Sequence, residues 1–247
     1  MSALVVLLHG FTHTGASWDP VVAALGESYR PLAPDIRGHG TASERRPVDL
    51  DHVIEDLSTR APQRFTLAGY SMGGRIALHA ALALGGRVER LLLIGASPGI
   101  ADPTERAARR ADDEQLAREL DRSTIEEFAR RWAQTPVLAG QPPAARAAAH
   151  ADRLRSTPAG LARALRGLGT GALPSLWERL GELRMPVELL VGERDMKFRE
   201  VAERMGEGIA RARVHVIPGA GHAVHLEAPG QVAELISGTP LSRFRTS

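Results

Sequence analysis

Gly69-Tyr70-Ser71-Met72-Gly73 is the stretch of sequence that decides the fold, because it matches the pattern G-x-S-x-G. The apolar run at residues 65–68 directly before it predicts a buried strand, and the residues from Gly74 onward predict a helix. A strand, a sharp turn and a helix in this order are typical of a turn that presents a nucleophilic serine. In a chain with 25 glycines the pentapeptide alone would be a weak indication, so its place between strand and helix carries the interpretation.

Around this turn, short apolar runs alternate with helical stretches, which predicts an α/β fold with a mostly parallel central sheet flanked by helices. Strands are expected at residues 3–8, 30–34, 64–68, 88–94, 187–191 and 213–217. Helices are expected between them, for example at residues 17–25, 73–84, 198–209 and 231–236. No strand is expected from about residue 99 to 171, where Ala, Arg, Glu and Leu indicate amphipathic helices. We therefore predict a core of residues 1–98 and 172–247 and a helical lid of residues 99–171.

Composition excludes several classes of protein. The chain has no cysteine, which excludes disulfides, thiol nucleophiles and thiolate metal sites. The formal net charge is +2, and 30 of the 31 basic residues are arginine, so the composition does not indicate nucleic-acid binding. The apolar run at the start is too short for a signal peptide or a membrane span, so a cytoplasmic protein is expected. Neither metal-site spacing nor a nucleotide-binding glycine loop is present, which predicts no metal and no cofactor.

In the fold that presents its serine on a G-x-S-x-G turn, the acid and then the histidine of the triad follow the serine along the chain. Asp195 follows an expected strand in a loop that contains a glycine, so its carboxylate is well placed to hold an imidazole. Glu193 in the same loop and Asp102 after the preceding strand are the weaker alternatives.

The histidine and the oxyanion hole complete this prediction. His222 is the first polar side chain after the last expected strand, and His225, three residues later, is its rival. His9-Gly10 follows the first strand, so the backbone N–H of Phe11 is expected to form one half of an oxyanion hole and that of Met72 the other.

Several loops carry residues that are more specific than the triad. They are residues 8–12 (LHGFT), 69–75 (GYSMGGR), 191–198 (VGERDMKF) and 217–227 (IPGAGHAVHLE), with residues 105–110 (ERAARR), Trp132, Pro136 and residues 154–156 (LRS) in the expected lid. On these residues nearly the whole chain resembles the MenH family, the 2-succinyl-6-hydroxy-2,4-cyclohexadiene-1-carboxylate synthases of the α/β-hydrolase superfamily. The resemblance implies the α/β-hydrolase fold, with the lid inserted after the strand that is sixth in the full fold.

The reaction that this resemblance implies is an elimination and not the cleavage of an ester. A base removes a proton from a ring carbon of 2-succinyl-5-enolpyruvyl-6-hydroxy-3-cyclohexene-1-carboxylate, pyruvate leaves, and a cyclic diene of menaquinone biosynthesis remains. Ser71, poised by His222 and Asp195, would act as the base, and the oxyanion hole would stabilise enolate-like charge.

Such a small polycarboxylate needs cationic side chains, and arginine suits carboxylates better than lysine. Arg75 lies one turn into the expected helix after Ser71, so its side chain can reach the pocket. The resemblance implies further substrate contacts at Tyr70, Arg109, Trp132, Arg155 and Lys197. Arg106 and Arg110 are the alternatives if the register in the lid is shifted. No partner besides this substrate is expected, and the protein would be a monomer or a weak homo-oligomer.

Two other classes of function stay open. A carboxylesterase or a carbon–carbon bond hydrolase would use the same triad. An esterase for apolar acyl groups, however, would not gather arginines around Ser71. A ligand receptor that keeps the triad without catalysis is the other class, and tight binding with slow turnover would favour it. Dehalogenases and most epoxide hydrolases are excluded because they use Asp where this chain has Ser71.

Overall fold

A sheet of six parallel strands forms the centre of the computed structural model, which describes residues 3–238. The strand order is β2-β1-β3-β4-β5-β6. The strands are β1 Ala3–Leu8, β2 Tyr29–Leu32, β3 Phe65–Tyr70, β4 Val88–Ile94, β5 Val187–Gly192 and β6 Ala212–Ile217. The prediction of a parallel sheet built from these six parts of the chain is therefore confirmed.

Several boundaries differ from those expected. β2 ends at Leu32 and not at Pro34, and this strand lies at an edge of the sheet, where a proline such as Pro31 is tolerated. β3 continues to Tyr70, so the strand ends directly before Ser71. Helix α2 at Leu50–Arg60, which was not among the examples named from the sequence, has its N-terminus capped by the side chain of Asp49.

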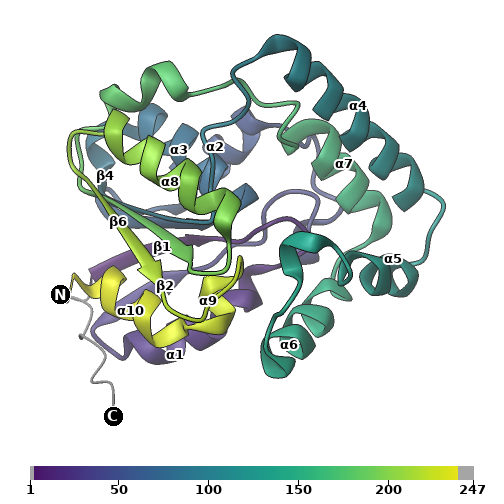
Figure 1. Ribbon diagram of the computed structural model, residues 1–247, viewed down its shortest axis with the longest axis horizontal. Coiled ribbons are helices and arrows are strands. Elements are labelled where there is room, and N and C mark those ends of the chain that lie inside the picture. Colours follow the sequence, from purple (N-terminus) through teal and green to yellow (C-terminus); the bar gives the residue numbers. More distant parts are fainter. Residues whose placement is uncertain (1–2, 239–247) are drawn as a thin grey trace.

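Helices cover both faces of the sheet, as Figure 1 shows. On one face lie α2, α3 at Met72–Leu84 and α8 at Met196–Gly208. On the other lie α1 at Asp19–Leu25, α9 at Val224–Glu227 and α10 at Pro229–Ser237. The helix expected at residues 17–25 is divided into a short 3-10 helix, Gly15–Trp18, and α1.

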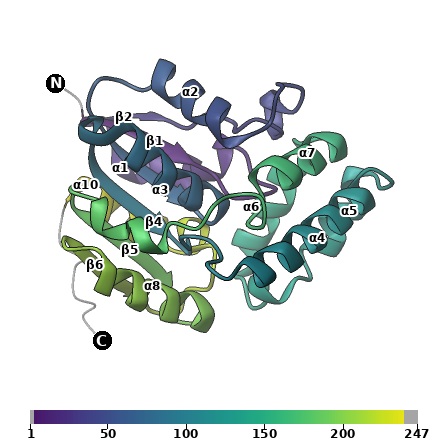
Figure 2. The same cartoon turned by 90° about the horizontal axis from the view of Figure 1, so that it is seen from above.

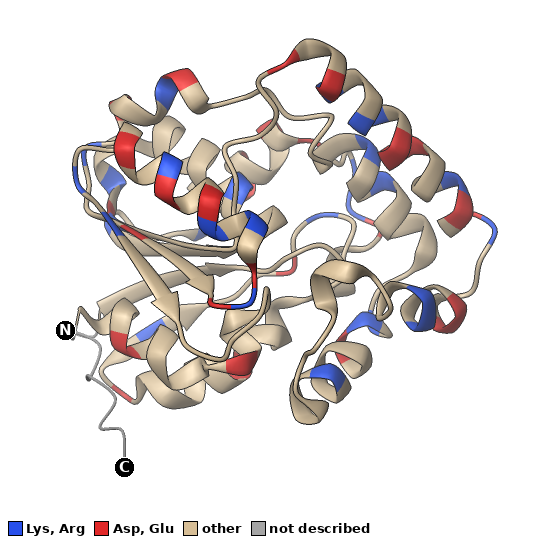
Figure 3. Ribbon diagram, in the orientation of Figure 1, with Lys and Arg blue, Asp and Glu red and all other residues tan. Residues whose placement is uncertain are grey.

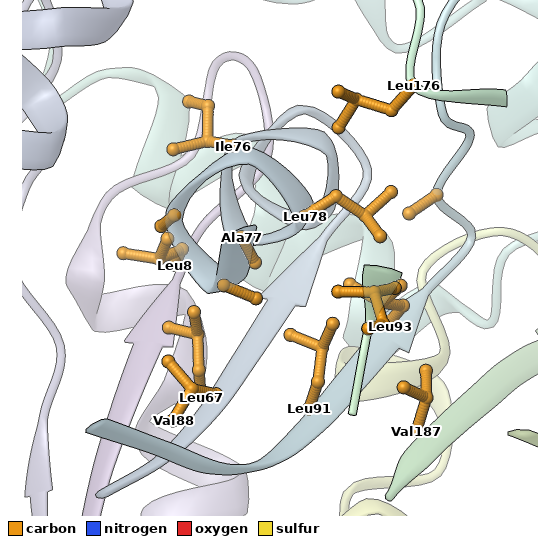
Figure 4. Close-up of a cluster of buried hydrophobic side chains, with 14 of the residues drawn as sticks. Leu8, Leu67, Ile76, Ala77, Leu78, Val88, Leu91, Leu93, Leu176 and Val187 are labelled. Carbon is orange, nitrogen blue, oxygen red and sulfur yellow. The ribbon is translucent and has the colours of Figure 1, made fainter. Parts of the chain in front are cut away.

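Side chains along the central strands alternate between two hydrophobic layers, as the pleat of a strand requires. Val6 and Leu8 pack in the layer beneath α3, whereas Val5 and Leu7 pack against α1 and α10. Figure 4 shows the first layer, in which side chains of α3 such as Leu78 lie over those of the strands. Burial on both faces explains why these strands are continuous apolar runs.

Four α-helices lie between β4 and β5 (Figure 2), and we call the part of the chain expected to form the lid, residues 99–171, the insertion. They are α4 Pro103–Leu120, α5 Ile125–Trp132, α6 Pro143–Arg153 and α7 Pro158–Leu168. The prediction that this segment contains no strand is confirmed. The helices enclose a small core of their own, made of Ala117, Leu120, Phe128, Leu161, Ala162 and Leu165.

Charged residues of both signs are interleaved along the outer helices, as on α4 and α8 in Figure 3. Within residues 3–238, none of the helices combines the length and the apolar character that a membrane crossing requires.

Candidate active site

The turn at Ser71 has the strained backbone that the sequence pattern predicts. Ser71 has φ +51°, which non-glycine residues rarely adopt, and its N–H donates to the carbonyl oxygen of Ile94 at 2.8 Å. A Cβ on Gly69 would overlap the carbonyl oxygen of Gly73, and one on Gly73 would overlap that of Leu8. These glycines therefore let β1, β3 and the start of α3 approach closely enough to hold the serine at the end of its strand.

The three predicted triad residues lie within hydrogen-bonding distance of one another. Nδ1–H of His222 donates to Oδ2 of Asp195 at 2.6 Å, and Nε2 of His222 accepts from Oγ of Ser71 at 3.2 Å. Asp195 and His222 are both buried, at 8% and 5% exposed. They come from the loops after β5 and β6, which end at the same edge of the sheet as β3. A carboxylate that orients the imidazole and an imidazole that accepts the serine proton form the arrangement that activates a serine.

The loop that carries His222 is fixed by a carboxylate that sequence reasoning missed. Glu227 accepts from the N–H of Gly221 at 2.8 Å and from that of Ala223 at 3.2 Å, on either side of His222. Arg194 donates to the same carboxylate at 3.0 Å and, through its other nitrogen, to the carbonyl oxygen of Gly140 in the insertion at 2.8 Å. Glu227 lies five residues after His222, but no local pattern marked it as a support for the loop.

The alternative triad residues have other partners. The carboxylate of Asp102 accepts from the N–H of Glu105 and caps α4. Glu193 accepts from the N–H of Gly219 at 2.9 Å on the surface. His225 is fully buried against the ring of Tyr70, and this burial lowers its pKa well below the usual range.

The backbone N–H groups expected to form the oxyanion hole, those of Phe11 and Met72, have no hydrogen-bond acceptor among the described residues. Met72 is the first residue of α3, so its N–H adds to the positive end of the helix dipole beside Ser71. The two donors and the serine all line one cavity of about 410 Å³.

This cavity is apolar with a few cations. Its described lining includes the side chains of Arg75, Arg109 and Lys197 and contains no aspartate or glutamate. Aromatic and aliphatic residues form most of the remaining wall, among them Phe11, Leu116, Trp132, Leu165, Trp177 and Phe198. A cavity of this kind suits a small ligand that carries negative charge.

Arg75 and Arg109 differ in how they are held. Arg75 is 8% exposed, and its guanidinium has no hydrogen-bond partner among the described residues. Burial, helped by the nearby charge of Arg109, lowers the pKa of Arg75 to about 10, so it remains a cation. Arg109 donates from Nε to Asp113 at 2.8 Å, and Asp113 also accepts from the N–H of Gly171. Asp113 therefore orients Arg109, a role that sequence reasoning missed.

The other predicted substrate contacts are divided between the cavity and its surroundings. Trp132 lies in the wall against the ring of Phe11, and Lys197 reaches the wall from the start of α8. Tyr70 is buried beside the ring of His222 and does not line the cavity. Arg155 is 64% exposed and lines a separate depression with Asp35 and Thr41, away from Ser71. Arg106 and Arg110 do not line the cavity either.

Two small polar side chains in the wall, Ser97 and Thr170, were also not expected. Ser97 lies in the loop after β4 and Thr170 in the loop after α7, and nothing in the local sequence indicates that these loops meet. Within residues 3–238, no group of three or more His, Asp or Glu side chains is arranged to hold a metal ion.

Known proteins resemble this chain over almost all of its length. The model of the alpha/beta hydrolase family matches residues 5–235. The putative 2-succinyl-6-hydroxy-2,4-cyclohexadiene-1-carboxylate synthase of Bacillus subtilis is 34% identical, over 96% of this chain and 89% of that protein. The synthase of the same name from an Enterobacter species is 32% identical over 94% and 90%.

Solved structures with a similar fold include a member of the same family. The structure of MenH from S. aureus superposes with a TM-score of 0.89 at 31% identity, covering 96% of this chain and 92% of that one. A thermophilic esterase from Thermogutta terrifontis superposes with a TM-score of 0.83 at 24% identity, covering 96% and 89%, which shows the shared fold.

Proposed function

From the premise that this chain belongs to the alpha/beta hydrolase family and, within it, to the 2-succinyl-6-hydroxy-2,4-cyclohexadiene-1-carboxylate synthases of menaquinone biosynthesis, we propose a role for each residue around Ser71. The reaction is the elimination of pyruvate from 2-succinyl-5-enolpyruvyl-6-hydroxy-3-cyclohexene-1-carboxylate. Ser71, His222 and Asp195 form the base, and Phe11 and Met72 form the oxyanion hole.

Proton removal begins at the serine. Ser71 passes its proton to Nε2 of His222 as its oxygen takes a proton from C2 of the substrate ring, and Asp195 stabilises the resulting imidazolium. The electron pair of the broken C–H bond forms a new ring double bond, the existing double bond shifts, and the bond from C5 to the enolpyruvyl oxygen breaks. The leaving group departs as the enolate of pyruvate and takes up a proton to become pyruvate. The imidazolium of His222 gives up its proton, which restores the base, and the 2,4-diene remains. The 3.2 Å and 2.6 Å hydrogen bonds of His222 support this relay.

Charge develops on the ketone oxygen of the succinyl group, because C2 is adjacent to that ketone. The unpaired N–H groups of Phe11 and Met72 would donate to this oxygen. Removing one such donor typically costs an enzyme 10²- to 10³-fold in kcat, so this pair would supply a large part of the rate.

The observation that carries the proposal is the buried, unpaired guanidinium of Arg75 in the cavity of Ser71. Burying a cation without a carboxylate is costly, and an anionic substrate that enters the cavity would offset that cost. Arg109 and Lys197 add positive charge to the same wall, which favours a substrate with several carboxylates. The side chain of Trp132 would pack against the ring of the substrate, and Tyr70 would support the imidazole of His222 through the contact between their rings. We do not include Arg155, because its side chain is exposed and lines a separate depression and not the cavity of Ser71.

The test offers the purified protein the cyclohexene substrate and a panel of short p-nitrophenyl esters. Release of pyruvate, measured with a coupled dehydrogenase, and a change in absorbance from the conjugated diene would follow the elimination. The wild type should eliminate pyruvate with negligible ester cleavage, and Ser71→Ala should lose at least about 10³-fold in kcat. Ester cleavage without elimination would make the protein a hydrolase, and tight binding without either reaction would make it a receptor.

The insertion would act as a lid over this reaction, since α4, α5 and α7 contribute Arg109, Trp132 and Leu165 to the cavity wall. We also propose a cytoplasmic enzyme that is a monomer or a weak homo-oligomer, in keeping with a small-molecule substrate. Size-exclusion chromatography with light scattering would test the oligomeric state, and a stable tetramer would contradict it.

A further inference from the structure

Asp152, in the last turn of α6, joins the insertion to the loop that follows β1. Its carboxylate accepts from the backbone N–H of Thr14 at 2.8 Å, from the hydroxyl of Thr14, and from Nδ1 of His13 at 3.2 Å. The side chain is buried, at 6% exposed, and lies outside the wall of the Ser71 cavity. A buried carboxylate with partners on two consecutive residues holds their backbone in one place.

Arg153, the next residue of the insertion, forms a hydrogen bond with the same loop. Arg153 is 1% exposed and donates from Nε to the hydroxyl of Thr12 at 3.2 Å. Thr12 has φ +70°, a conformation that costs a non-glycine residue about 1–3 kcal/mol and persists where its surroundings enforce it. Residues 152 and 153 thus contact three consecutive residues of the loop, at positions 12, 13 and 14.

That loop is the one that carries the oxyanion-hole donor. The N–H of His13 donates to the carbonyl oxygen of Gly10 at 3.1 Å and closes a four-residue turn with Phe11 and Thr12 at its centre. A positive φ at the third position is the mark of a type II turn, which sets the direction of the peptide groups within it. If Thr12 or His13 shifts, the N–H of Phe11 changes direction.

We propose that Asp152 is a positioning residue for catalysis, which holds the Gly10–His13 turn so that the N–H of Phe11 points at the charge that develops on the substrate. The proposal rests on the proposed function for its reaction, but the aim of the Phe11 N–H matters to any chemistry at Ser71 that creates an oxyanion. Asp152 acts through Thr14 and His13 and not by touching the substrate.

The electrostatics of Asp152 agree with this geometry. Burial by itself would raise the pKa of this carboxyl, but the hydrogen bonds from His13 and Thr14 outweigh it and lower the pKa to about 2. The carboxylate is therefore ionised at every pH at which an enzyme of this kind would work. The contact of Arg163 with the carbonyl oxygen of Ser43, which also joins the insertion to the core, does not reach the oxyanion loop.

The experiment compares Asp152→Ala and Asp152→Asn with the wild type, at a temperature where each is fully folded by circular dichroism. Glu114→Gln is the matched control, because Glu114 also lies in the insertion and pairs with Arg118 and Arg166 without contacting the core. The readouts are kcat and KM for elimination, the pH profile of kcat, and the rate at which a fluorophosphonate labels Ser71. This label needs the oxyanion hole but not the natural substrate.

We expect Asp152→Ala to lower kcat and the labelling rate at least tenfold, with KM within about twofold and the inflection of the pH profile unchanged, because the triad itself is intact. Asp152→Asn should recover part of the loss, since its amide oxygen still accepts from Thr14, and Glu114→Gln should match the wild type. Unchanged kcat and labelling in a folded Asp152→Ala, or a loss confined to KM, would overturn the proposal. If no variant, the wild type included, eliminates pyruvate but Asp152→Ala still labels slowly, the proposed function fails and the positioning role stands.

Discussion

Gly95 lies directly against the imidazole of His222: a Cβ atom on residue 95 would be 2.8 Å from Cε1 and 2.9 Å from Nδ1 of that ring. Gly95 follows β4 and has φ +52°, and its N–H donates to the carbonyl oxygen of Leu190 in the neighbouring strand. The backbone at residue 95 cannot retreat without breaking this hydrogen bond. The absence of a side chain at residue 95 thus allows the imidazole of His222 to lie directly against the backbone after β4.

Gly95→Ala should therefore displace His222 and lower kcat by about 10²-fold, the loss typical of a catalytic group moved by about 1 Å. Gly85→Ala is the matched control, because Gly85 has the same φ of +52° but nothing within 4 Å of an added Cβ. Both variants should lose about 1–2 kcal/mol in the free energy of unfolding from the positive φ. Steady-state kinetics and urea unfolding would measure the two effects, and equal activities of the two variants would show that the ring has room to move.

Arg75→Met should separate stability from activity. The guanidinium is buried without a carboxylate, so an apolar side chain of similar length should raise the free energy of unfolding by on the order of 1 kcal/mol. The same change should lower kcat/KM for the carboxylate-rich substrate about 10- to 100-fold, because a charge-assisted hydrogen bond is lost. Arg64→Met, at an exposed arginine paired with Glu89, should change neither quantity appreciably. A destabilised and fully active Arg75→Met would mean that Arg75 supports the fold and not the substrate.

Arg109→Ala and Arg155→Ala test where the insertion places its cations. Arg109 lines the Ser71 cavity and is oriented by Asp113, so its loss should raise KM about tenfold or more. Arg155 is exposed in a separate depression, so its loss should leave KM within about twofold. A KM effect of Arg155→Ala as large as that of Arg109→Ala would show that the insertion moves to bring Arg155 to the substrate.

The meeting of Ser71, Asp195 and His222 could be predicted because each lies in a short loop after a strand, where glycines leave a recognisable local pattern. Ser71 directly follows β3, and Asp195 and His222 lie three and five residues after the ends of β5 and β6. The strand order that gathers them at one edge follows from the parallel topology.

Asp152 and Asp113 could not be predicted as supports of the site, because each is a single carboxylate on a helix that meets a distant loop. Asp152 is 138 residues from Thr14, and Asp113 is 58 residues from Gly171. Residues so far apart form no short motif with a characteristic spacing that could be recognised in the sequence. Arg155 was expected at the cavity but lines a separate depression. It lies in the turn after α6, which ends at Arg153, and a sequence motif does not determine which way a side chain beyond a helix end faces.

His79 makes the stability of the fold depend on pH. It lies in α3, one turn after Arg75, and is 7% exposed with no partner for Nε2 among the described residues. Burial first, and then the positive charges of Arg75 and Arg179, lower the pKa of His79 from 6.5 to about 4. Between these values the unfolded chain binds a proton that the folded chain excludes, so the folded state loses stability as the pH falls from 6.5 to 4.

His79→Leu should remove this contribution, because leucine cannot bind a proton in either state. The wild type should lose up to about 3 kcal/mol more than the variant between pH 6.5 and 4, since each pKa unit is worth about 1.4 kcal/mol. The loss will not vanish in the variant, because burial also lowers the pKa of His9 to about 4. Urea unfolding at half-unit pH steps measures the difference. His150→Leu, at a partly exposed position on α6, is the control and should keep the pH dependence of the wild type. A His79→Leu curve parallel to the wild-type curve would mean that His79 is protonated in the folded state and that its ring has access to water.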